Sequence, residues 1–245
     1  MKSEAVFSIS LTVVLLVFAF FLFQPEADPR FPSHCGPAQK FLDLNWNGYP
    51  YEVDQPITRG TPGIPFEVRF GQPVVRTAAG PFSNWPLELD PPQELEGSSQ
   101  VPYAQIRIPM ELGAEAYFIS FEAAILPSES EPAAYDFTLF LDGNSTHSLK
   151  FDWRGEVRAI VTPNHSGEKF VTIPPRERFR IEAFLDLSQE RVSFKVNEAE
   201  WTGPTFGRFK DLTGIRISFR DSLSGGAVAA IDNLEIYSFM DSNKK

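Results

Sequence analysis

Hydrophobic and polar residues alternate with a period of two over most of the chain that follows residue 100. In the segment 178–183, Phe179, Ile181 and Ala183 fall on one side of an extended backbone and charged residues fall on the other, as in a strand with one wet side. The same alternation predicts further strands at 103–108, 117–125, 135–141, 157–161, 192–197, 215–219 and 228–237. Strands at this spacing, without a convincing soluble helix among them, indicate an all-β antiparallel sandwich.

Residues 25–92 differ from this pattern, because most of the 21 prolines of the chain lie there. Proline lacks the backbone donor that a helix or a central strand requires. We therefore expect a proline-rich spacer at residues 25–39, and then irregular coil with short edge strands such as 65–70. The folded domain is predicted to cover residues 40–240, with a polar tail at 241–245.

Residues 6–23 carry no charge. As a helix they would extend about 27 Å, close to the ~30 Å hydrocarbon core of a membrane. The run ends without a small-residue cleavage site, so residues 1–24 are predicted to be a signal anchor, a single transmembrane helix, with a cleaved signal peptide as the alternative. Lys2 before the run, and Glu26 and Asp28 after it, favour a domain in the periplasm or extracellular space.

The net charge of −10 and the lack of a basic stripe argue against a nucleic-acid partner, whose phosphates are neutralised by clustered lysine and arginine. The single cysteine, Cys35, excludes a disulfide within the chain. The three histidines, His34, His147 and His165, show no paired ligand spacing. We therefore expect neither a zinc site nor a cofactor.

The C-terminal part of the sequence has a cadence of strands and short turns in the segments 179–187, 192–197, 212–219 and 230–237. In the last segment, Asp232-Asn233 precedes alternating hydrophobic residues. This cadence resembles the concanavalin A-like lectin/glucanase superfamily, specifically laminin-G-like jelly rolls, over roughly half the chain. The resemblance implies a jelly-roll β-sandwich, and its motifs concern the fold rather than catalysis.

Asp232 has the strand parity of Leu234 and Ile236, so we expect its carboxylate to point toward the core and to accept hydrogen bonds there. Some members of the superfamily bind calcium, and calcium coordination by Asp232 or Asn233 is the alternative role. A calcium site needs several oxygen ligands, and the sequence shows no second acidic cluster at a defined spacing.

The glucanase branch of the superfamily carries Glu-x-Asp-x-x-Glu on one strand, which places two carboxylates on the same face. Glu88-Leu89-Asp90 begins this motif, but Pro91-Pro92 cannot continue a central strand. Glu52-Val53-Asp54 meets a proline at position 56. The sequence therefore favours a binding module over an enzyme.

We expect a membrane-anchored, extracytoplasmic, non-catalytic module that binds carbohydrate or another surface polymer. Sugar sites combine aromatic faces with amide and carboxylate groups, and the candidate ligand-binding residues are Trp153, Trp201, Asp142 and Asn144. Both tryptophans also have a structural interpretation, as residues of the core or its rim. The alternatives are a glycoside hydrolase or polysaccharide lyase with an unrecognised site, lined by carboxylates such as Glu122 and Glu182, and a structural envelope protein.

Overall fold

The computed structural model describes residues 30–32, 35, 37–46, 52–58, 63–82, 86–91, 103–110, 113–127, 134–143, 145–161, 167–205, 209, 211–221 and 226–240. The chain divides into two compact units, Met1–Cys35 and Gly36–Lys245. The predicted signal anchor at residues 1–24 lies outside the described residues. No helix within the described ranges is long and apolar enough to cross a membrane. The described residues of the second unit form strands, turns and irregular segments.

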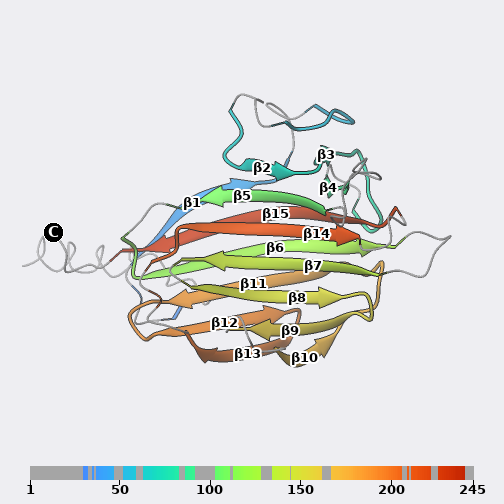
Figure 1. The fold of residues 1–245 in the computed structure, drawn as a ribbon. Coiled ribbons are helices and arrows are strands. Elements are labelled where there is room, and N and C mark those ends of the chain that lie inside the picture. The colour runs from blue at the N-terminus through green and yellow to red at the C-terminus, as the bar shows by residue number, and fades with distance from the viewer. Residues whose placement is uncertain are drawn as a thin grey trace, which may run out of the picture. The chain divides into compact units, whose positions relative to one another are not determined.

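Two antiparallel sheets pack face to face in the second unit (Figure 1). The seven-stranded sheet has the spatial order β10 (Glu168–Thr172), β9 (Glu156–Ile160), β8 (Thr146–Asp152), β7 (Tyr135–Asp142), β14 (Gly214–Asp221), β5 (Tyr103–Pro109) and β2 (Glu67–Phe70). The eight-stranded sheet has the order β13 (Ala199–Pro204), β12 (Arg191–Val196), β11 (Phe179–Asp186), β6 (Ala116–Leu126), β15 (Val228–Phe239), β4 (Leu87–Leu89) and β3 (Val74–Val75), and β1 (Ala38–Leu44) also pairs with β15. Strands that are distant in sequence are neighbours in space, as in jelly rolls.

Inward-facing side chains of both sheets form one hydrophobic core. Phe151 of β8 stacks on Phe179 of β11 with ring centroids 4.8 Å apart, so this contact joins the two sheets. Phe137 of β7 meets Phe151 edge to face at 5.6 Å. Every second residue of a strand reaches this core, and each buried aromatic ring removes a large apolar area from water. The alternation seen in the sequence is therefore the pattern that stabilises the sandwich.

The prediction of an all-β antiparallel sandwich is confirmed. The predicted strands correspond to β5, β6, β7, β9, β11, β12, β14 and β15, and the predicted edge strand at 65–70 contains β2, at the end of its sheet. Sequence reasoning did not identify β1, β3, β4, β8, β10 and β13. β1 begins at Ala38, inside the stretch predicted as spacer.

The prediction that Asp232 points into the core is wrong, because a β-bulge in β15 changes its parity. The pairing of β15 with β6 shifts register just after Asp232, and Asn233 takes a positive φ of 53°. Ile231 and Leu234 both belong to the core although they are an odd number of positions apart. Asp232 therefore lies on the outer face of the sheet, opposite Glu122 of β6. A strict two-residue period cannot reveal such a bulge.

Candidate functional site

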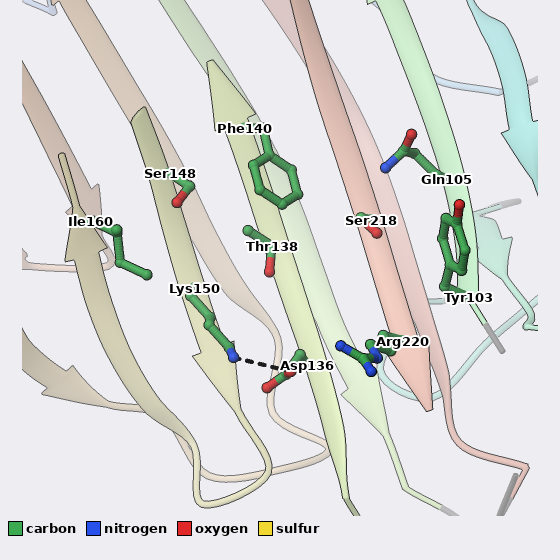
Figure 2. A pocket seen from close by; sticks show the side chains of 10 residues that line it. All are labelled: Tyr103, Gln105, Asp136, Thr138, Phe140, Ser148, Lys150, Ile160, Ser218 and Arg220. Atoms are coloured by element: carbon green, nitrogen blue, oxygen red, sulfur yellow. Dashed lines mark ion pairs between the residues drawn. The ribbon is translucent and has the colours of Figure 1, made fainter. Parts of the chain in front are cut away.

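The outer face of the seven-stranded sheet is hollowed into a pocket of about 600 Å³. Figure 2 shows the side chains of β5, β14, β7, β8 and β9 that surround this space. We call it the central pocket, and it is lined by Tyr103, Gln105, Asp136, Thr138, Phe140, Ser148, Lys150, Ile160, Ser218 and Arg220. These residues alternate along their strands with core residues, so the period that builds the core also sets this face.

Strand register arranges the floor of the central pocket as a transverse polar row. Gln105 of β5 lies opposite Ser218 of β14, and Ser218 lies opposite Thr138 of β7. Thr138 in turn lies opposite Lys150 of β8. Gln105 and Thr138 are each 8% exposed, which places them at the base of the pocket. Amide and hydroxyl groups both donate and accept hydrogen bonds, and a row of them suits a ligand that carries hydroxyl groups.

Two aromatic side chains flank this row on opposite sides. Tyr103 packs against Phe70, with ring centroids 4.2 Å apart. Phe140 lies on the other side, and its ring centroid is 4.3 Å from the guanidinium carbon of Arg216. Burial raises the pKa of Tyr103, so its phenol stays protonated at neutral pH and can donate a hydrogen bond. The pocket thus combines apolar ring faces with polar groups between them.

The charges that line the central pocket are not balanced. Lys150 Nζ lies 3.0 Å from Asp136 Oδ2, in an ion pair between β8 and β7. Arg220 of β14 lies opposite Asp136 in the register, but it makes no ion pair with any residue in the described part of the chain. Arg216, four positions earlier on β14, is held by both carboxylate oxygens of Asp142. Arg220 is therefore the cation that is left exposed at the pocket.

The fold places Asp142 and Trp153, two of the sequence-predicted ligand residues, at opposite ends of β8. Asp142 lies beside the start of β8, opposite Thr146, whereas Trp153 directly follows the other end of that strand. The indole of Trp153 is 48% exposed, and the guanidinium of Arg154 lies 4.8 Å from its ring centroid. Asn144 lies outside the described residues. Neither Asp142 nor Trp153 lines the central pocket, and their roles as ligand contacts stay predictions.

Trp201 of β13 joins the edges of the two sheets. Its Nε1 donates a 2.8 Å hydrogen bond to Glu168 of β10, and its ring stacks on Phe194 at a centroid distance of 6.1 Å. β13 and β10 are the edge strands on this side of the sandwich. A contact that closes an open edge limits unwanted strand pairing, so a structural role accounts for the position of Trp201. Its role as a ligand platform stays a prediction.

The carboxylates named for a possible hydrolase lie on the other sheet. Glu122 and Glu182 are on the outer face of the eight-stranded sheet, where Arg178 and Arg180 pair with them. A second depression there, of about 290 Å³, is lined by the carboxylates of Glu122, Asp43 and Glu235 but not by that of Glu182. The two carboxylates therefore do not converge on one cleft.

Beside the central pocket, Asp136 lies opposite Asp152 across β7 and β8. Asp152 Oδ1 accepts the backbone N–H groups of Arg154 and Glu156 at 2.9 and 3.0 Å, so this carboxylate holds the turn between β8 and β9. Within the described residues, no group of three or more Asp, Glu, His or Cys side chains could hold a metal ion. The chemistry that this face supports best is reversible binding through hydrogen bonds, ring contacts and charge.

Sequence reasoning missed the residues of the central pocket. Gln105, Thr138 and Ser218 all occupy polar positions of strands that the alternation predicts. The signal that could have identified them is therefore the set of polar positions in the alternating pattern, which face away from the core. What the sequence lacks is the spatial order that brings residues 105, 138 and 218 side by side.

The architecture is a concanavalin A-like jelly roll. The chain is similar to the winged bean acidic lectin solved with methyl-α-D-galactose, with a TM-score of 0.53 and 10% identity over 84% of this chain and 100% of the lectin. Peanut lectin with a 9-residue peptide gives a TM-score of 0.53 at 12% identity, with the same coverage. A sialidase is similar with a TM-score of 0.51 and 14% sequence identity. The match covers 74% of this chain but only 17% of the sialidase. No family profile and no curated protein matches the sequence. The predicted resemblance is thus confirmed for the fold.

Proposed function

We propose that this protein is a glycan-binding module and that the central pocket is its binding site. The observation that carries the proposal is an open depression with a floor of amide and hydroxyl groups between Tyr103 and Phe140. Sugars offer hydroxyl groups at their edges and apolar C–H faces, which match polar side chains and aromatic rings. The volume of about 600 Å³ falls within the range of small-molecule sites, roughly 300 to 1,000 Å³.

The fold is compatible with this proposal. The winged bean acidic lectin, which shares the fold, was solved with methyl-α-D-galactose. Proteins with unrelated functions can share one fold, so a shared architecture alone does not establish a ligand. The composition of the central pocket itself is therefore what supports a glycan ligand for this chain.

The proposed role is non-catalytic. Glycosidases place two carboxyl groups around the scissile bond, about 5 to 5.5 Å apart in retaining enzymes and farther apart in inverting ones. Asp136 is the single carboxylate among the described residues that line the pocket, and Lys150 already engages it. The raised pKa of Tyr103 also disfavours the phenolate that proton abstraction at neutral pH would need.

The proposal includes display of the module on the outer side of a membrane by residues 1–24. The uncharged run at 6–23 is long enough to span the hydrocarbon core, and proline-rich segments such as the one that follows act as semi-rigid spacers. This arrangement would make the pocket accessible to polymers outside the cytoplasm. Retention of the full chain in membranes after an alkaline wash supports it, and release into the supernatant contradicts it.

A glycan array probed with the full chain tests the proposed function. Ser218 is half-buried at the centre of the polar row, and the substitution Ser218→Trp would fill the pocket with an indole ring. We expect the wild-type chain to bind at least one class of glycan. We expect Ser218→Trp to weaken that binding by about a hundredfold, because the indole occupies the space of the ligand.

Ser193→Trp is the matched control. Ser193 is also half-buried, and it lies between two strands on the outer face of the eight-stranded sheet. We expect this variant to bind as the wild-type chain does. Equal loss in both variants, or full binding by Ser218→Trp, would contradict the assignment of the site. New reducing ends in a bound glycan would contradict the non-catalytic role.

A further inference from the structure

We infer that the central pocket selects anionic glycans, with the guanidinium of Arg220 binding a carboxylate or sulfate group of the sugar. The inference rests on the proposed function and adds the chemical class of the ligand. A guanidinium presents its N–H donors in a planar fork that matches the paired oxygens of such anions.

Arg220 is an exposed residue on β14, two positions from Ser218 at the centre of the polar row. Register places it between Tyr103 on β5 and Asp136 on β7, and Figure 2 shows its guanidinium turned toward the Asp136 side of the pocket. A sugar that lies on the floor would therefore bring its substituents next to this cation.

Neighbouring cations are already neutralised, which distinguishes Arg220 from them. Lys150 pairs with Asp136 at 3.0 Å. Arg216 is held by both oxygens of Asp142. Arg220 has no such partner among the described residues. One uncompensated positive charge thus faces the pocket, although the whole chain has a net charge of −10.

Desolvation turns this charge into selectivity. A ligand that covers Arg220 removes water from the guanidinium, and a neutral sugar returns no charge to compensate for that loss. An anionic sugar does compensate, through charge-assisted hydrogen bonds. The pocket therefore discriminates against neutral glycans as well as attracting anionic ones.

Asp136 sets the strength of this preference. Its carboxylate neutralises Lys150 and also lies opposite Arg220, so it repels an anion that approaches either cation. Removal of this charge by Asp136→Asn frees Lys150 for the ligand. The geometry thus predicts that Asp136→Asn, which removes a negative charge from the pocket, strengthens the binding of an anionic glycan.

The test is titration of the full chain with two matched pairs of polymers. Polygalacturonate and its methyl ester differ in the carboxylate charge, and dextran sulfate and dextran differ in the sulfate. We expect the wild-type chain to prefer the charged member of at least one pair by about tenfold. Arg220→Gln should abolish this preference, because the charged polymer loses its ion pair and the uncharged polymer no longer covers an uncompensated charge. Asp136→Asn should increase the preference. Arg180→Gln, on the outer face of the other sheet, is the control and should change nothing.

The outcomes separate the inference from the proposed function. If Arg220→Gln keeps the preference, or if Asp136→Asn weakens binding of the charged polymer, the inference is overturned. It is also overturned if the wild-type chain binds neutral glycans on the array and neither charged polymer, although the proposed function then stands. If the wild-type chain binds no glycan of any kind, both fail.

Discussion

The two outer faces of the sandwich are built by the same alternation but use their polar residues differently. On the eight-stranded sheet, Glu122 is paired with Arg178 and also accepts a 2.7 Å hydrogen bond from Asn233 Nδ2. Burial opposes ionisation of Glu122, but these two donors lower its pKa below the ordinary value. On the seven-stranded sheet, Arg220 faces the central pocket and has no ion pair within the described residues.

A cover over one face explains part of this difference. Phe82 is 2% exposed and packs on the outer face of the eight-stranded sheet with Ala79, Ala124 and Ala230. The guanidinium of Arg178 lies 5.0 Å from the ring centroid of Phe82. Phe82 therefore stabilises the fold from this face, whereas Arg220 in the central pocket is exposed. Substitutions on the two faces should therefore have opposite effects on stability and binding.

The largest effect on stability should come from Phe82→Ala. Removal of a buried aromatic ring leaves a cavity and costs about 3 to 5 kcal/mol of the free energy of unfolding. Phe140→Ala is the matched change in the central pocket, where the ring is half-buried. It should cost less than about 1 kcal/mol, because its site is open to water, and it should weaken glycan binding.

Urea unfolding and glycan titration of the two variants check this contrast. The folded fraction of Phe82→Ala should bind glycan as the wild-type chain does. The contrast between the two faces would be contradicted if folded Phe82→Ala binds glycan more weakly than the wild-type chain. It would also be contradicted if Phe140→Ala destabilises the chain without affecting glycan binding.

A smaller, pH-dependent effect is expected from Asp232→Asn. Burial, together with the charge of Glu122 opposite, raises the pKa of Asp232 to about 6, although the N–H of Asn233 and the charge of Arg178 act in the other direction. An unfolded aspartate has a pKa of about 3.9. The folded chain holds the proton more tightly, so ionisation above pH 6 lowers its stability, and this cost is absent below about pH 4 where both states are protonated.

Asp232→Asn removes that cost, and we expect it to raise the free energy of unfolding at pH 8 by about 1 to 3 kcal/mol. The gain should decline between pH 6 and pH 4. Urea unfolding of the variant and the wild-type chain at both ends of this range measures it. A loss of stability at pH 8, or a gain that is the same at pH 4, would show that the carboxylate is not destabilised by ionisation in the fold.

Much of the fold could be predicted, because alternation reports directly on which residues reach a core. The strands with long alternating runs, such as β11 and β14, are the ones identified. β8 was missed although His147, Leu149 and Phe151 alternate there with polar residues. Asp232 was misplaced because a bulge adds a residue that the period does not count.

The candidate site was harder to predict, because it depends on which strands are neighbours. Gln105, Thr138 and Ser218 come from three distant segments, and only the order β5, β14, β7 brings them together. Trp153 and Trp201 were predicted as ligand contacts because aromatic side chains suit sugars. In the structure, Trp201 joins the edges of the two sheets and Trp153 lies in a turn. Residue type alone did not indicate position on the folded surface.

The most direct measurement of the central claim is the rate of lysine acylation in the full chain, with and without a saturating glycan from the array. Lys150 lies in the central pocket, and Lys40 and Lys195 lie on the other sheet, with similar side-chain exposures of 37%, 40% and 42%. Peptide mass spectrometry follows all three amines in one sample. We predict that the glycan slows acylation of Lys150 several-fold and leaves Lys40 and Lys195 unchanged. Slower acylation of Lys40 or Lys195 with an unchanged rate at Lys150 would contradict the assignment of the binding face.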